Sequence, residues 1–283
     1  MRRDVWVIAR LALQEAVRRR VLAVVAVLTV GCGALYLVGC ITLRHHLEHL
    51  PQFQKGGQLE PLVPATLLGL ASFATLFLGS VLAVFLAASA VKGDADRGLV
   101  QPLVVRPVGR PTYLAGRAVA AMAVSGGFVL VVSVVATVVT RLLFSSLPPH
   151  AWAVIPPLVV AVLVVTMLTL LVSSLLSTVA TGISVLMAYG AGLIAGLLGE
   201  LARAFSAHTL AVIANTVSYL LPFEALYRDA LARVSPSGAI GQLVQLGPLG
   251  GAHSGGVRLW LFTVGYLCVC SGLTVWVFSR SDL

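Results

Sequence analysis

The chain has 283 residues, of which 59% are hydrophobic and 10% are charged, and its mean hydropathy is +1.00. A soluble domain carries about 25% charged residues and about 45–50% apolar ones. The difference excludes a soluble enzyme, a disulfide scaffold and a free nucleic-acid-binding protein, and it indicates an integral membrane protein. The formal net charge of +9 bears on orientation, because basic residues determine on which side of a membrane a short loop remains.

Residues 3–20 predict an amphipathic helix that precedes the first span. Its last three residues are arginines, and they directly precede a long apolar run. Such a helix can lie in the membrane interface with its arginines facing anionic lipid headgroups. An ordinary basic end that only sets orientation is the alternative. The residues expected at this interface are Trp6, Arg10, Arg18, Arg19 and Arg20.

The chain contains enough long apolar runs for six membrane crossings, since one crossing takes about 20 helical residues. The predicted spans are residues 21–43, 62–91, 112–140, 151–173, 178–199 and 259–278. The run 151–199 has no charged residue and is too long for one span, so we place a tight turn between Ser173 and Thr178. Pro156 and Pro157 predict a kink or a late helix start in the fourth span. We expect an all-α integral membrane protein in which residues 1–283 form a single transmembrane domain.

Residues 200–258 are too polar to cross the membrane and too apolar for a free loop. Their short apolar stretches are interrupted at Pro222 and at two later proline-containing turns. This pattern predicts short outer helices that lie at, or dip into, one membrane face. In the span before them, Gly192 and Gly196 offer a small-residue surface for close helix packing, but the spacing does not name the partner.

The distribution of basic residues favours an orientation with both termini inside. In this orientation the inner segments hold twelve of the 19 lysines and arginines, and all 6 histidines fall outside. An excess of Lys and Arg in cytoplasmic segments is the usual topology signal. We therefore expect a multi-pass protein with both termini in the cytoplasm.

The sequence lacks the residues that would power transport directly. It has no GxxxxGK[ST] motif, so it does not bind ATP through a P-loop. No Asp, Glu, Lys, Arg or His lies in the middle of a predicted span, which argues against a proton-coupled transporter. Any work that the protein does must therefore be driven from elsewhere, and an apolar or amphipathic substrate is favoured over a small ion.

The segment His45–His49 fits the HxxEH pattern of one class of zinc proteases. It lies in a short outer loop that Pro51 interrupts, and no downstream helix supplies an obvious further carboxylate ligand. We expect a hydrated interfacial loop and no resident metal, with His45, Glu48 and His49 as weak metal candidates. A membrane-embedded metal-dependent enzyme built on this cluster is the alternative function.

The only sizeable inner loop, residues 92–111, combines a charged turn, a short apolar segment, a proline stop and a basic return to the membrane. The apolar residues of this loop are too few to span and too apolar for free solvent; they are Leu99, Val100, Leu103, Val104 and Val105. An apolar patch with a charged rim is typical of a protein contact. A self-packed turn that only joins two spans is the alternative.

This loop resembles the sequence GE-x-E-R-G-T-L … L-L-x-R-P-V-x-R-x-x-Y-L-x-G-K of the ABC-2 type membrane subunits of ATP-binding-cassette transporters, close to the NosY-like group. The matching residues are Gly93, Asp94, Asp96, Arg97, Gly98, Arg106, Pro107, Val108, Arg110, Tyr113, Leu114, Gly116 and Arg117. Asp94 stands where the pattern has Glu, Leu99 where it has Thr, and Pro102 interrupts a segment that is usually one short helix. The stretches Ser173–Gly182 and Leu221–Leu231 resemble the same family.

The resemblance implies the permease subunit of an exporter in the bacterial cytoplasmic membrane. It would work as a dimer, with a second copy or a related permease, and with two copies of a separate ATPase that holds ATP and Mg²⁺. This chain would bind no cofactor, catalyse no reaction and contact membrane lipid but no nucleic acid. A channel or scaffold subunit without ATP coupling is the alternative. The residues implied to contact the ATPase are Asp94, Asp96, Arg97, Gly98, Leu99, Val100, Leu103, Arg106, Pro107 and Arg110.

Overall fold

The computed structural model describes residues 10, 20–48, 62–88, 110–144, 148, 150–205, 208–234 and 255–280. Within these ranges every regular element is a helix. The elements are α2 (Arg20–Glu48), α3 (Leu62–Ala88), α5 (Arg110–Leu143), the 3₁₀ turn η2 (Ala151–Val154), α6 (Ile155–Leu175), α7 (Thr178–Ala204), α8 (His208–Leu220), α9 (Phe223–Val234) and α11 (Gly256–Arg280).

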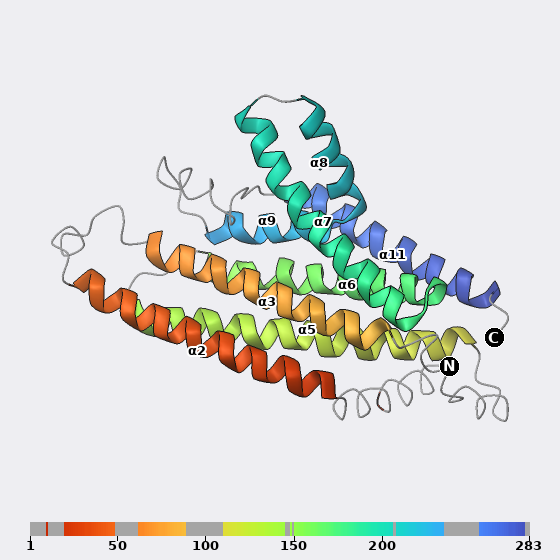
Figure 1. Ribbon diagram of the computed structural model, residues 1–283, viewed down its shortest axis with the longest axis horizontal. Coiled ribbons are helices and arrows are strands. Elements are labelled where there is room, and N and C mark those ends of the chain that lie inside the picture. The colour runs from red at the N-terminus through yellow and green to blue at the C-terminus, as the bar shows by residue number, and fades with distance from the viewer. Residues whose placement is uncertain are drawn as a thin grey trace.

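Six of the described helices are long and apolar enough to cross a membrane, namely α2, α3, α5, α6, α7 and α11. In Figure 1, α3, α5 and α6 run alongside one another in alternating directions, so that α3 ends and α5 begins at the same end of the bundle. Of the described helices, α2, which comes first in the chain, begins at that same end, and α11, which comes last, ends there. The prediction of an all-α membrane protein with six spans is therefore confirmed, whereas the helix at residues 3–20 stays a prediction.

The core of the bundle is the group formed by α3, α5 and α6, which contact one another. Leu76 of α3, Val129 of α5 and Val162 of α6 are fully buried in it. A Cβ atom at Gly79 would overlap the side chain of Val129, so glycine at this position lets α3 and α5 approach closely.

Most of the buried serine and threonine hydroxyl groups inside the spans are hydrogen-bonded within the protein, whereas Ser80 Oγ and Ser133 Oγ have no partner among the described residues. Ser72 and Thr166 each donate a hydrogen bond of 2.7 Å to the carbonyl four residues earlier in their own helix. Ser125 Oγ and Thr166 Oγ1 are 3.0 Å apart and connect α5 to α6. Such bonds are needed because no water is available in the hydrocarbon core to solvate a polar group.

The fourth span begins late, as its two prolines predict. Ala151–Val154 form η2, and α6 starts at Ile155 with proline in its first turn. Proline is tolerated there because the first helical N–H groups have no partner within the helix. After α6 ends at Leu175, α7 begins at Thr178, within the stretch where the sequence predicts a turn.

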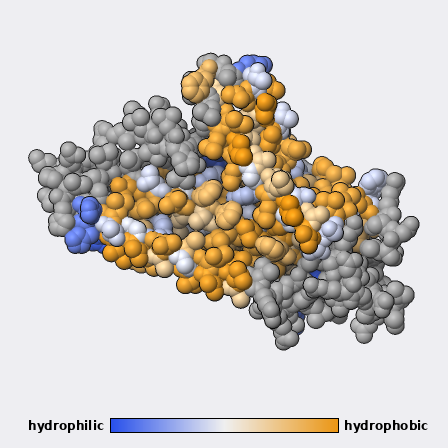
Figure 2. Space-filling model, in the orientation of Figure 1, coloured by the Kyte–Doolittle hydropathy of each residue, from blue (hydrophilic) through white to orange (hydrophobic). Residues whose placement is uncertain are grey.

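The helices between the fifth and sixth spans form a bent pair. The axes of α8 and α9 differ by 100° across the break at Leu221–Pro222. In Figure 1, α8 turns back along α7 and this hairpin projects from the bundle, while α9 lies against α6 and η2. Figure 2 shows hydrophobic side chains over most of the described surface in view, with hydrophilic ones at the end of α2 and at the tip of the α7–α8 hairpin.

Candidate functional site

The residues implied to contact an ATPase fall almost entirely outside the described ranges. Asp94, Asp96 and Arg97 lie outside them, as do Gly98, Leu99, Val100, Leu103, Arg106 and Pro107. Arg110 is the first residue of α5. The loop therefore stays a prediction, and its two attachment points, the end of α3 and the start of α5, lie at the same end of the bundle (Figure 1).

The interface and metal candidates are described only in part. Arg10 is exposed and Arg20 begins α2, whereas Trp6, Arg18 and Arg19 lie outside the described residues. His45 is exposed in the last turn of α2 and Glu48 ends that helix, whereas His49 lies outside the described ranges. Among the residues with described positions, no group of three or more His, Cys, Asp or Glu could hold a metal ion.

The glycines of α7 receive side chains of α9. A Cβ atom at Gly192 would lie 2.6 Å from Cζ of Phe223, and one at Gly196 would overlap the carboxylate of Glu224. Phe223 also stacks on Tyr189 of α7, with ring centroids 4.9 Å apart and an interplanar angle of 13°. The packing partner that the glycine spacing left unnamed is thus α9.

Two carboxylates of α9 are buried, and each is paired with an arginine one turn later. Glu224 is 4% exposed and accepts a hydrogen bond from Nε of Arg228. Asp229 is 1% exposed and accepts bonds of 2.7 Å and 3.1 Å from Arg233. A buried carboxylate without a partner would be strongly destabilising, so the pairs are a condition for burying this face of α9.

Asp229 also connects α9 to the start of the last span. The Gly255 N–H donates a hydrogen bond of 3.1 Å to Asp229 Oδ1. The next residue, Gly256, has φ of +56°, a conformation that glycine adopts without strain. The chain can therefore turn sharply into α11 directly beside α9.

Tyr227 lies on α9, a helix outside the six spans, and its side chain is buried. Its Oη has no hydrogen-bond partner among the described residues. Burial is the main cause that raises the pKa of Tyr227 above its usual range, and the nearby Tyr189 and Glu224 raise it further. The phenol is therefore neutral at physiological pH.

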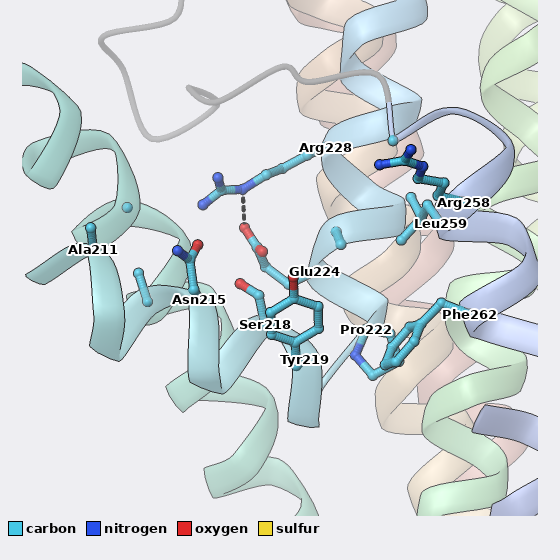
Figure 3. A pocket seen from close by; sticks show the side chains of 14 residues that line it. Ala211, Asn215, Ser218, Tyr219, Pro222, Glu224, Arg228, Arg258, Leu259 and Phe262 are labelled. Atoms are coloured by element: carbon cyan, nitrogen blue, oxygen red, sulfur yellow. Dashed lines mark hydrogen bonds and ion pairs between the residues drawn. The ribbon is translucent and has the colours of Figure 1, made fainter. Parts of the chain in front are cut away.

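A cavity of about 690 Å³ opens where α7, α8, α9 and α11 meet. Figure 3 shows its side chains converging from the bent α8–α9 pair and from the first turns of α11. Pro222, Leu259 and Phe262 supply apolar wall. The polar lining comes from Asn215, Ser218, Tyr219, Glu224, Arg228 and Arg258. Its volume lies within the range of about 300–1,000 Å³ that is typical of small-molecule sites.

The sequence reasoning did not identify this cavity or the ion pairs. The i,i+4 spacing of Glu224 with Arg228 and of Asp229 with Arg233 was the available signal, because such residues face each other on a helix. That spacing does not say that the carboxylates are buried, since this depends on α6, α7 and α11. The cavity also depends on the 100° bend between α8 and α9.

These observations define a polytopic helical membrane protein with a bent helix pair before its last span. The sequence model of one family, described as ABC-2 family transporter protein, matches residues 6–283. The chain belongs to this family, and it is accordingly a permease-type membrane subunit of the ABC transporter class. None of the curated proteins with which the chain was compared matches it.

Proposed function

We propose that this chain is the permease subunit of an ABC exporter in the bacterial cytoplasmic membrane, within the NosY-like group. Two copies of a separate ATPase would hold ATP and Mg²⁺, and two permease subunits would form the translocation path. The observation that carries the proposal is the family match over residues 6–283 on a bundle with six candidate spans.

The arrangement of the helix ends supports a coupling role for residues 92–111. Since α3 ends and α5 begins at one end of the bundle, the loop between them belongs to that end (Figure 1). The excess of Lys and Arg in the segments assigned to this end favours the cytoplasm. Both termini and the coupling loop would then face the compartment that contains ATP.

Charge reversal in the loop tests this proposal. The double variant Asp94→Lys/Asp96→Lys should reduce co-purification with the partner ATPase by about tenfold or more, because repulsion replaces attraction at the contact. The measurement is the ratio of ATPase to permease after affinity purification from membranes. Stimulation of ATP hydrolysis by the permease should fall in parallel.

The control is Glu60→Lys, a single charge reversal at a position predicted to lie in an outer loop. It should leave both readouts at the level of the natural chain. Equal co-purification of the loop variant and the natural chain would contradict the proposed coupling site. A chain that never co-purifies with an ATPase would contradict the proposed function itself.

A further inference from the structure

The shape of the cavity between α7, α8, α9 and α11 depends on the bend between α8 and α9 and not on the packing of α3, α5 and α6. Because α8 and α9 meet at 100°, their inner sides form two walls of a corner. The first turns of α11 form a third wall (Figure 3), and Gly199 of α7 also lines the cavity. The cavity is thus built within one copy of the chain and needs no second subunit to exist.

The charges that line the cavity are unequal. Among the described lining residues there is one carboxylate, Glu224, and there are two guanidinium groups, Arg228 and Arg258. Arg228 is paired with Glu224 inside the cavity wall (Figure 3). Arg258 is exposed and makes no ion pair with a carboxylate of the described residues. The excess positive charge therefore belongs to Arg258.

The position of Arg258 adds to its attraction for an anion. It lies in the first turn of α11, where the helix dipole presents its positive end. A guanidinium with open donors binds phosphate or carboxylate in a bidentate manner. Asn215 and Ser218 of α8 line the same cavity and can supply further hydrogen bonds.

The remaining lining of the cavity is apolar. Leu259 and Phe262 follow Arg258 along α11, and Ala211 and Ala214 lie on α8. A small hydrated ion gains nothing from these walls, whereas an alkyl or aryl group is removed from water by them. The polar and apolar parts together fit a molecule that carries both an anionic group and an apolar body.

We propose that this cavity binds an amphipathic anion, with Arg258 as the ligand for its phosphate or carboxylate group and with Leu259 and Phe262 against its apolar part. The proposed binding involves the permease alone. The assignment of the bound molecule as a substrate class rests on the proposed function, but the binding test does not use the ATPase.

The test uses the purified full-length chain in a neutral detergent and three probes. Decyl phosphate carries the expected head and tail, decyltrimethylammonium has the same tail with the opposite charge, and inorganic phosphate has the head alone. Binding is measured as saturable, equimolar occupancy by native mass spectrometry and as a shift in the melting temperature. Decyl phosphate should bind, while the other two probes should bind at least about tenfold more weakly.

Two variants test the site. Arg258→Gln should weaken the binding of decyl phosphate by about tenfold, as expected for the loss of one charge-assisted hydrogen-bonded pair. Ala211→Phe retains every charge of the cavity and should weaken binding by filling it. Arg141→Gln removes the same charge from an exposed position at the end of α5, outside the lining, and should bind as the natural chain does.

Equal losses in Arg258→Gln and Arg141→Gln would overturn the proposal, because binding would then follow net charge. Equal binding of decyltrimethylammonium would overturn the anion preference, and equal binding of inorganic phosphate would overturn the amphipathic class. Because no nucleotide or ATPase is present, loss of the coupling contact leaves these outcomes unchanged. An absence of probe binding, in turn, would not change the result expected from the co-purification test of the coupling loop.

Discussion

The central spans and the peripheral ones differ in burial although they are alike in hydropathy. In the most apolar stretches of α3 and α6, 61% of the residues are buried inside the protein, compared with 11% in α2 and 22% in α11. All of these helices are apolar enough to cross a membrane. Hydropathy therefore reports contact with a non-aqueous environment and does not distinguish protein from lipid.

The central and peripheral spans differ in what their polar groups contact. In α3 and α6, Ser72, Thr75, Thr166 and Thr169 are buried in the bundle. Fewer such residues are buried in the peripheral helices, where large apolar side chains such as Val27 of α2, 72% exposed, face outward. Burial inside this protein is thus associated with hydroxyl groups and glycine, which allow helices to approach and to form hydrogen bonds.

Among substitutions of buried residues, the largest loss of stability is expected at Asp229. Asp229→Ala should lower the free energy of unfolding by about 2–4 kcal/mol, because it removes the charge-assisted hydrogen bonds from Arg233 and leaves the Gly255 N–H without its acceptor. Unfolding can be followed with a thiol-reactive dye as the additional reaction of the buried Cys40 and Cys270 above that of the exposed Cys32 and Cys268. A melting temperature equal to that of the natural chain would contradict the structural role of this pair.

A second prediction compares a central glycine with a peripheral one. Gly79→Val should destabilise the protein by about 1–3 kcal/mol, because its side chain would overlap Val129. Gly39→Val is the matched control, since a Cβ atom at Gly39 of α2 has no neighbouring atom within 4 Å. The same dye-based melting experiment applies to both. Equal shifts for the two variants would contradict the difference between α3 and α2.

The smallest expected effect concerns one hydrogen bond between spans. Ser125→Ala removes the bond to Thr166 and should destabilise the protein by about 0.6 kcal/mol, the average for such bonds in a membrane protein. Ser271→Ala removes a hydroxyl whose partner among the described residues is the Cys268 carbonyl of the same helix, and it should have a smaller effect. Reversible unfolding in mixed detergents can resolve the two values. A larger loss for Ser271→Ala would contradict the ranking.

Much of the fold followed from the sequence because each span must satisfy its own backbone hydrogen bonds. The number of spans, the helical class and the late start of the fourth span at Ile155 could be predicted from apolar run lengths and proline positions. The helices between the fifth and sixth spans, α8 and α9, were predicted as elements, because Pro222 and the mixed composition mark them. Their burial was not, because apolar residues in such a segment do not show what covers them.

The sequence by itself determined that the chain lies in a membrane, that it crosses it with helices and that it carries no P-loop, since these depend on composition and local spacing. Only the tertiary structure decided that Gly196 receives Glu224 and that Asp229 holds the start of α11. It also decided that Arg258 faces a cavity beside Phe262. The contacts of Gly196 with Glu224 and of Asp229 with Gly255 join residues far apart in the chain, and the cavity depends on the 100° bend, which no local pattern specifies.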